Sequence, residues 1–462
     1  MHPPALWHLP TILPARYWLC NATVPPALFT GVADTPDTPQ APHKSHATLH
    51  TTPQLSLLVE GGHITALQPQ ARGDAPRFEL DGALLFPAFV DPHCHLDKGD
   101  LLAAGLAPEQ ELHAAIDAVR NDYARWTRSE LEARIGFALR TAQAHGTRHL
   151  LTYADWPGGA VPLAWQVLCE QRQAWAGRVG LTLASLAALD LFDDTAEAER
   201  LGRELAAASG VLGLFVPAAC DLETLLPRAL DLAERLNLCL DFHIDEHTTA
   251  AHSHLRSVAR AVHERGLGTR TVFGHGCALA VLPPAELDAT LDAMAACGAG
   301  LVALPHTNLY LQDSTPQLPR RTPRQRGLAP LHEAQRRGIP LALGADNHRD
   351  PFFPGGDLDP LQTLALGALA AQLDDAALRW SALVTTAPAR MLGLAWDGIL
   401  KPGAPADLVL HPARNSAEWL ARPGWGRRVI RSGQLLDTAA ATLPHWRELD
   451  GLRAARLSKA SA

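Results

Sequence analysis

Two histidines at the end of an apolar run are the first residues in this chain whose type and spacing could do chemistry. His93 and His95 lie in the stretch FPAFVDPHCHLDK, which occupies residues 86–98. On an extended strand, residues two apart project to the same side, so the two imidazoles can chelate one metal ion. Because the chain holds 22 histidines, an isolated H-x-H also arises by chance. The pair therefore gains meaning only if further ligands follow similar runs downstream.

Further potential ligands do follow other apolar runs. They are His243 with Asp245 and Glu246 just after it, His275, and Asp346. Three imidazoles and one carboxylate suit a single divalent ion such as zinc or iron, with one coordination position left for water. Such an ion lowers the pKa of its bound water, so the set of residues predicts hydrolysis.

Each remaining polar residue fits a supporting role in such a site. Asp346 could accept the proton of the water, and Glu246 could pass a proton to the substrate. His275 could hydrogen-bond the attacking oxygen and stabilise the developing charge.

Neighbouring residues leave alternatives open. Asp245 is either an orienting partner of a ligand histidine or a loop acid. Cys94 points to the opposite face from its neighbours, and we expect it to pack. Lys98 either pairs with Asp97 or neutralises an anionic group of the substrate.

Eight apolar runs alternate with helical patterns after residue 83, which predicts βα units and a parallel sheet. The expected strands cover residues 84–90, 149–153, 180–187, 211–218, 238–243, 271–275, 300–306 and 340–346. Segments such as 129–144, 223–236 and 285–296 have apolar residues at helical spacing. Eight such units fit a (β/α)8 TIM-like barrel, in which the carboxyl ends of the strands meet at one mouth. An open doubly wound sheet is the alternative, but no G-x-G-x-x-G follows any of these strands.

Both ends of the chain carry short β-type runs separated by turn residues. We expect residues 1–85 and 391–462 to form one small β-sandwich domain beside a metal-dependent barrel domain at 86–390. We expect the tail from Ala454 to be frayed.

The overall composition argues against several classes of protein. A net charge of −8 without a long basic run disfavours nucleic acid as a partner. Seven scattered cysteines with no C-x-x-C disfavour a disulfide framework and fit a reducing cytoplasm. No uninterrupted apolar run reaches ~18 residues, so we expect no membrane insertion and a small molecule as the substrate.

Composition also excludes two related kinds of metal site. The lysines are Lys44, Lys98, Lys401 and Lys459. No strand between the first and the eighth therefore supplies the lysine that a carbamate bridging two metals requires. No P-C-x-x-C segment accompanies an H-x-E, so the compact zinc deaminase module is absent.

Together these segments resemble the amidohydrolase superfamily, and within it the cytosine deaminase branch, along nearly the full chain. The resemblance rests on FPAFVDPHCHLDK at 86–98, HIDE at 243–246, GHGCA at 274–278, LPHTNLYLQD at 304–313 with PRRTPRQRG at 319–327, LGADNHRDPFFPGG at 343–356 and KPGAPADLVL at 401–410. It implies one Zn²⁺ or Fe²⁺ ion held by His93, His95, His243 and Asp346. It also implies that Glu246 is the proton shuttle and that His275 contacts the metal-bound water.

Four positions around the substrate limit what this resemblance implies. Where the branch carries a glutamine that reads the pyrimidine amide edge, this chain has Ala188. Asn347 follows Asp346 in place of a second acid, and Tyr153 lies near the end of strand two in place of a basic and imidazole pair. Phe352 stands where the branch places an aromatic ring against a flat substrate. Because unpaired polar edges cost about 1–3 kcal/mol each, we expect a related heterocycle and not cytosine.

The expected function is therefore hydrolytic deamination of a small nitrogen heterocycle by a metal-activated water. Hydrolysis of cyclic or linear amide C–N bonds by the same residues is the alternative, and a non-catalytic protein of the same fold is a more remote one. The resemblance leaves the native metal, the substrate and a homo-oligomeric state open.

Overall fold

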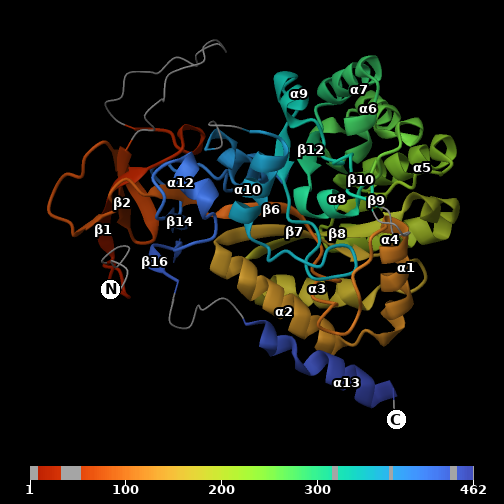
Figure 1. Ribbon diagram of the computed structural model, residues 1–462, viewed down its shortest axis with the longest axis horizontal. Helices are drawn as coiled ribbons and strands as arrows, with labels where there is room; N and C mark the ends of the chain where they lie inside the picture. The colour runs from red at the N-terminus through yellow and green to blue at the C-terminus, as the bar shows by residue number, and fades with distance from the viewer. Residues whose placement is uncertain (1–8, 33–53, 315–320, 374–377, 437–444, 461–462) are drawn as a thin grey trace.

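A barrel of alternating strands and helices forms the larger part of the molecule, and a smaller sheet lies at one side of it (Figure 1). The computed structural model describes residues 9–32, 54–314, 321–373, 378–436 and 445–460. Within these ranges, no helix combines the length and the apolar character needed to cross a membrane.

Eight parallel strands form the barrel and follow one another in chain order. They are β6 (Phe89–Cys94), β7 (Thr147–Asp155), β8 (Gly180–Ala188), β9 (Leu212–Phe215), β10 (Leu240–Ile244), β11 (Thr271–His275), β12 (Gly300–Ala303) and β13 (Leu341–Leu343). The seam between the last and first strands is joined through Asp346, whose backbone N–H donates to His93 O (2.8 Å) and whose carbonyl accepts from His95 N (3.2 Å). The expected (β/α)8 barrel is confirmed.

Local sequence signals begin and end the helices that surround these strands. At the start of α2 (Arg128–His145), Thr127 Oγ1 accepts from Glu130 N, and the helix ends at Gly146 with a φ of +97°. The Asp221 carboxylate caps α5 (Leu222–Arg235) through Thr224 N. The other helices are α1 (Leu112–Asp122), α3 (Leu163–Ala174), α4 (Thr195–Ala207), α6 (Leu255–Glu264), α7 (Pro284–Cys297), α8 (Pro305–Leu311), α9 (Leu331–Arg336), α10 (Pro360–Ala370), α11 (Thr386–Met391), α12 (Ser416–Ala421) and α13 (Gly451–Ala460).

Both ends of the chain contribute to the smaller sheet. Its strands are β1 (Arg16–Thr23), β2 (Gln54–Glu60), β3 (His63–Gln68), β4 (Arg77–Glu79), β5 (Leu84–Pro87), β14 (Leu408–His411), β15 (Arg428–Arg431) and β16 (Gln434–Leu435). The antiparallel pair β5–β14 joins the N-terminal strands to the C-terminal ones, and Figure 1 shows the red and blue ends of the chain side by side there. The expected small domain built from both ends is confirmed.

Several expected strands have other bounds in the structure: those expected at 149–153, 211–218 and 340–346 are β7 (Thr147–Asp155), β9 (Leu212–Phe215) and β13 (Leu341–Leu343). Three expected segments differ in kind. The run at 84–90 is two strands, because the chain leaves the small sheet at Ala88, whose N–H donates to Asp407 O, and enters the barrel at Phe89, whose N–H donates to Gly146 O. The run at 300–306 ends as a strand at Ala303, since Pro305 starts α8. The tail expected to fray from Ala454 is instead part of α13, which Figure 1 shows lying near α2.

Candidate active site and metal centre

The histidines and the aspartate singled out by their spacing converge at the carboxyl ends of four barrel strands. His93 lies in β6 and His95 follows it; His243 lies in β10, His275 ends β11, and Asp346 comes three residues after β13. All five side chains are buried. The barrel therefore gathers groups that lie up to 253 positions apart in the chain, from His93 to Asp346.

The backbone conformation of two of these residues directs their side chains into the mouth of the barrel. His275 has a φ of +70° and Asp346 a φ of +61°, in the left-handed region that residues with a side chain rarely adopt. Such conformations cost about 1–3 kcal/mol each and cluster at functional sites. The surrounding packing therefore holds both side chains in place against a local cost.

The distances between these side chains are short. His95 Nε2 lies 3.2 Å from Asp346 Oδ1 and 3.3 Å from His243 Nε2, and His93 Nε2 lies 3.5 Å from Asp346 Oδ1. Two triads, His93–His95–His243 and His93–His275–Asp346, each place one ligand atom per residue within 4.8 Å of the others.

The unsatisfied atoms at this point fit a divalent cation. His93 Nε2, His275 Nε2 and both carboxylate oxygens of Asp346 are buried with no hydrogen-bond partner. Buried polar atoms are normally paired, because an unpaired one costs about 1–3 kcal/mol. The lone pair of a histidine nitrogen and the oxygens of an ionised carboxylate are ligand atoms that a borderline cation such as zinc takes.

Tyr153 and Asp241 fix the tautomer of His93. The Tyr153 hydroxyl donates to Asp241 Oδ1 (2.8 Å) and lies 2.9 Å from His93 Nδ1. Since its single proton goes to the carboxylate, the hydroxyl oxygen accepts from His93 Nδ1–H. The lone pair of His93 is therefore on Nε2, the nitrogen that faces Asp346.

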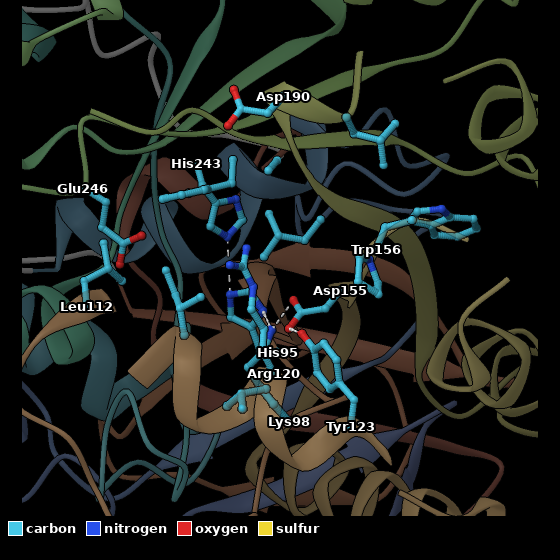
Figure 2. Close-up of a pocket in the computed structure, with 18 of the residues that line it drawn as sticks. His95, Lys98, Leu112, Arg120, Tyr123, Asp155, Trp156, Asp190, His243 and Glu246 are labelled. Atoms are coloured by element: carbon cyan, nitrogen blue, oxygen red, sulfur yellow. Dashed lines mark hydrogen bonds and ion pairs between the residues drawn. The ribbon is translucent and has the colours of Figure 1, made fainter. Parts of the chain in front are cut away.

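Lys98 lies behind His95 in a buried network. Its Nζ lies 3.2 Å from His95 Nδ1, donates to Asp155 Oδ1 at 2.6 Å and lies 3.4 Å from Asp97 Oδ1. The Tyr123 hydroxyl donates to the other Asp155 oxygen, and Figure 2 shows Tyr123, Asp155 and Lys98 linked in this way. An ammonium only donates, so in this contact the single proton of neutral His95 is on Nε2, on the side of Asp346 and His243. Coordination of an ion through Nε2 by a neutral ring would require the proton on Nδ1, and hence Lys98 turned away from that nitrogen. The lysine charge is thus engaged by two carboxylates.

Glu246 and His275 face each other across the site, with His275 Nδ1 3.5 Å from Glu246 Oε1. Burial, reinforced by the charge of Asp346, raises the pKa of Glu246 well above its usual value. Burial lowers the pKa of His275 to about 3, so its ring is neutral near pH 7. Asn308 Nδ2 donates to His275 Nδ1 at 3.0 Å, which leaves the ring proton on Nε2.

Burial and neighbouring imidazoles also act on the other members of the site. Burial, assisted by Lys98, lowers the pKa of His95 to about 4, and burial with the adjacent histidines holds the pKa of His243 well below normal. Burial opposes ionisation of Asp346, but contacts with His93 and His95 outweigh it and hold the pKa of this carboxyl well below 3.8. Neutral imidazoles and an ionised carboxylate are the protonation states that metal ligands need.

Asp245 and Cys94 have structural contacts. Asp245 accepts from Ser253 Oγ and, at 2.7 Å, from His254 N, so it organises the loop after β10. This favours the loop-acid interpretation. Cys94 Sγ contacts Leu151 O at 3.3 Å in the barrel wall, as expected for a packing residue.

A cavity of about 780 Å³ opens above the converging histidines. Ala188, Asn347 and Phe352 line it, together with His95, His243, His275, Glu246 and Asp346. Figure 2 shows His243 and Glu246 on one side of this space, with Trp156 and Asp155 on the other. Three of the four positions expected at the substrate therefore lie at the cavity.

Tyr153 is the fourth, and the structure places it behind His93. Its side chain is fully buried and is not among the cavity-lining residues. Strand β7 continues for two residues beyond it, so Tyr153 lies one layer below the mouth and Asp155 is the residue that reaches the cavity. Sequence spacing alone set the end of this strand too early.

Sequence reasoning also missed residues that support the site. Asp241 precedes His243 by two residues on the same strand, so both side chains lie on the same face. This spacing could have identified Asp241 from the sequence. Asn308 lies in α8, the helix that begins two residues after the end of β12, close to a strand end where polar residues carry functional weight. Arg120 and Tyr123 reach the cavity from α1 and the turn after it, and no spacing rule links that segment to the strand ends.

A barrel that gathers imidazoles and a carboxylate at its strand ends beside a cavity defines a metal-dependent hydrolase. A family model described as the amidohydrolase family matches residues 166–418. A pterin deaminase of Rhizobium rhizogenes is 34% identical over 439 residues, which cover 94% of this chain and 96% of that protein. The chain belongs to the amidohydrolase family. This confirms the resemblance found in the sequence motifs and the expectation of an enzyme that hydrolyses carbon–nitrogen bonds.

Solved structures share the fold. 5-Methylcytosine deaminase from Klebsiella pneumoniae, liganded with 5-fluorocytosine, superposes with a TM-score of 0.73 at 22% identity, over 91% of this chain and 97% of that chain. Atrazine chlorohydrolase from Arthrobacter aurescens, complexed with zinc, superposes with a TM-score of 0.65 at 16% identity, over 96% of this chain and 100% of that chain.

Proposed function

We propose that this protein is a metal-dependent hydrolase that deaminates an amino-substituted nitrogen heterocycle of the pterin type. The observation that carries the proposal is the convergence of Glu246, His275 and Asp346 with two histidine-containing triads on the floor of one cavity. The substrate class is supported by the name of the relative from Rhizobium rhizogenes. The absence of an amide reader at Ala188 is a second reason to favour such a ring over cytosine.

The ligands that we propose for the ion are His93, His95, His243 and Asp346. Zn²⁺ or Fe²⁺ fits this set, and a fold neighbour is complexed with zinc. When bound, such an ion supplies a water of lowered pKa near neutral pH.

The protein's own side chains then move the protons. Asp346 accepts a proton from the attacking water at a carboxylate oxygen that has no other partner. Burial raises the pKa of Glu246 and so favours its protonated form, from which it can donate to a ring nitrogen of the substrate. His275 donates from Nε2 to the oxygen on which negative charge develops. The reaction is completed when the carbon–amine bond breaks. Ammonia leaves with the proton from Asp346, and the hydroxyl proton passes to Glu246 as the carbonyl forms, which restores both carboxyl groups.

The cavity wall supplies the surface for a flat ring. Phe352 lies with its ring 5.9 Å from Lys98 Nζ and lines the cavity. Ala188 leaves space where a larger side chain would contact the ring, and Asn347 points its amide at Asp350 Oδ2 (2.8 Å). We propose that Phe352 stacks on the substrate and that Ala188 and Asn347 bound its edges.

Turnover by metal-loaded protein tests the proposal. The protein is reconstituted with Zn²⁺ or Fe²⁺ and assayed with pterin, amino-substituted azines, cytosine and cyclic amides, and ammonia and product mass are recorded. Deamination exchanges NH for O, whereas ring opening adds one water. Ring-opened product would favour amide hydrolysis, and bound metal with no product from any compound would favour a non-catalytic protein.

Glu246→Gln separates chemistry from metal binding. We expect its metal content and melting temperature to match those of the wild type while kcat falls about 10²- to 10⁴-fold, because general acid–base transfer supplies a factor of that order. Metal content is measured by atomic emission on the same sample as the rate. Activity within about threefold of wild type would contradict the proton-transfer role.

Composition supports two further parts of the proposal. All seven cysteines are free, so we propose a reducing compartment, the cytoplasm, and a small molecule as the partner. Self-association is tested by sedimentation of the metal-loaded protein.

A further inference from the structure

Helix α1 presents to the cavity a face that is apolar except for one arginine. Leu112, Ile116 and Val119 line the cavity from this helix, at the three- and four-residue spacing of one helical face. Arg120 lines the cavity too, four residues after Ile116. Arg120 is an exposed residue, so its guanidinium can be reached from solvent.

Arg120 is a cation without a counter-charge among the described residues. Lys98, the other cation of the cavity wall apart from histidines, is bound to Asp155 and Asp97. Arg120 makes no ion pair or side-chain hydrogen bond within the part of the chain that the structure describes. Its guanidinium is therefore free to bind an anion from outside the chain.

The acids at the opposite wall are mostly engaged with other partners. Asp193 pairs with Arg228 at 3.3 Å, Asp194 caps α4, and Glu197 accepts from Gly159 N at 2.6 Å. Asp190 lies exposed on the short turn η3 (Leu189–Asp193), an ordinary place for a solvated carboxylate. In Figure 2, Asp190 and Arg120 lie on opposite sides of His243.

The size of the cavity leaves room beyond the reacting ring. Cavities of ~300–1,000 Å³ take drug-sized ligands, and a volume of about 780 Å³ lies in the upper part of that range. A ring seated at Glu246 therefore leaves space towards α1 for a substituent.

We propose that Arg120 is a specificity-determining residue that binds an anionic substituent, a carboxylate or a phosphate, on the heterocycle to be deaminated. The proposal rests on the proposed function of the site. A guanidinium matches either anion with two parallel N–H donors. Asp190 repels the same group from the opposite wall, so the two charges together orient the ring.

Paired substrates test this directly. Pterin and pterin-6-carboxylate share the reacting ring and differ in the anion, and kcat and KM are measured for both with wild type, Arg120→Gln, Arg120→Lys and Arg125→Gln. Arg125 is the matched control, because it lies in the same segment, is 74% exposed and is absent from the cavity wall. We expect Arg120→Gln to lower kcat/KM for the carboxylate about tenfold to a hundredfold, as for a lost charged hydrogen bond, and for pterin less than about threefold.

The pattern across variants decides the outcome. A loss confined to KM of the carboxylated substrate, partly restored in Arg120→Lys and absent in Arg125→Gln, supports the subsite. Equal losses for both substrates would mean that Arg120 stacks on the ring or acts structurally, and they would overturn it. A wild-type preference for a cationic substituent would assign the contact to Asp190 and would also overturn it.

A second measurement keeps the inference separate from the proposed function. If the wild type turns over neither pterin, the proposed function fails, and labelling by phenylglyoxal with and without inorganic phosphate then decides the inference. Phosphate that slows modification of Arg120 but not of Arg125, read by peptide mass, supports an anion subsite. Equal rates at both arginines, with and without phosphate, would overturn it.

Discussion

At the level of single residues, the hydroxyl of Tyr153 determines which nitrogen of His93 is free. The hydroxyl donates a hydrogen bond to Asp241 and accepts one from Nδ1–H of His93. The lone pair of His93 is therefore on Nε2, which faces the proposed ion. Partners of this kind orient ligand imidazoles and tune their basicity. Tyr153 therefore contributes to metal affinity from behind the site.

Replacing Tyr153 with phenylalanine should weaken zinc binding about 10- to 100-fold, because the His93 ring loses the acceptor that fixes its tautomer. Zinc affinity is measured by competition with a chromogenic chelator. Tyr17→Phe is the control, since Tyr17 is also buried and donates its hydroxyl to Gly433 O at 2.8 Å in the small sheet. Equal zinc affinity in both variants would contradict this role.

The histidines and Asp346 could be found from the sequence because side chains at barrel strand ends converge whatever the details of packing. The prediction that Tyr153 contacts the substrate was wrong, because β7 continues two residues beyond its apolar run and so places Tyr153 below the mouth of the barrel. The position of Arg120 at the cavity could not be predicted from the sequence, since a helix that lies over the mouth is positioned by tertiary contacts and not by the strand order.

At the level of elements, α13 fastens the segment that carries Arg120 and Tyr123. Arg456 donates to both oxygens of Asp122, at the end of α1, and to both oxygens of Glu130, at the start of α2, at 2.6–2.9 Å. Glu130 also pairs with buried Arg134, which donates to Asp97 O and Gly99 O. The C-terminal helix is thus connected to the backbone around Lys98.

Arg456→Ala should lower the free energy of unfolding by about 3 kcal/mol, because two largely buried carboxylates lose the cation they share. Among the described cations, Glu130 then keeps Arg134 alone, and Asp122 keeps only Arg125 at 4.0 Å. Arg453→Ala, on an exposed position of the same helix, should change it by less than about 0.5 kcal/mol. Urea unfolding measures both, and hydrogen exchange of α1 should rise only in Arg456→Ala. Equal destabilisation by the two variants would mean that the network adds nothing.

Strand β7 carries a histidine that links pH to stability. Burial, with Arg148 beside it, lowers the pKa of His149 from 6.5 to about 4, and its Nε2 lies 2.8 Å from Thr182 Oγ1. The unfolded chain takes up this proton near pH 6.5 and the folded chain only near pH 4. The contribution is therefore complete above pH 6.5 and is lost as the pH falls towards 4, by about 3 kcal/mol.

His149→Gln should remove that part of the pH dependence. Urea unfolding at pH 4.5 and pH 7 should give a smaller difference for the variant than for the wild type, while exposed His63→Gln should leave the difference unchanged. The same difference in all three proteins would contradict the assignment.

The positions of several helices and strands could be predicted from the spacing of apolar residues, because one face of each such element must pack against the core. The helix expected at 223–236 is α5 (Leu222–Arg235), and the strand expected at 271–275 is β11. The run at 84–90 could not be divided from sequence, because both halves are equally apolar and only the partners of Ala88 and Phe89 separate them. The helix α13 escaped prediction because Arg456 gains its stabilising partners only in the folded molecule.

At the scale of the whole molecule, the proposed ion lies at the seam that closes the barrel. His93 lies in β6 with His95 directly after it, and Asp346 follows β13. The backbone of Asp346 joins these two strands. In the part of the chain that the structure describes, the seam pairs β6 and β13 through a single isolated bridge, Cys94 with Asp346. Without a cation, unpaired nitrogen and oxygen atoms lie buried at this seam. Metal binding should therefore stabilise the whole barrel as well as permit turnover.

Removing the metal with a chelator should lower the melting temperature and abolish activity together, and zinc should restore both. At a free zinc concentration about a thousandfold above Kd, binding contributes about 4 kcal/mol to the folded state, which is several degrees in a domain of this size. Differential scanning calorimetry measures the shift, and Asp346→Asn serves as the matched variant, because it keeps the side-chain size while weakening the proposed site. Zinc should raise the melting temperature of the wild type and not of Asp346→Asn. A similar rise in both proteins would place the stabilising ion elsewhere and would remove the link between barrel closure and catalysis.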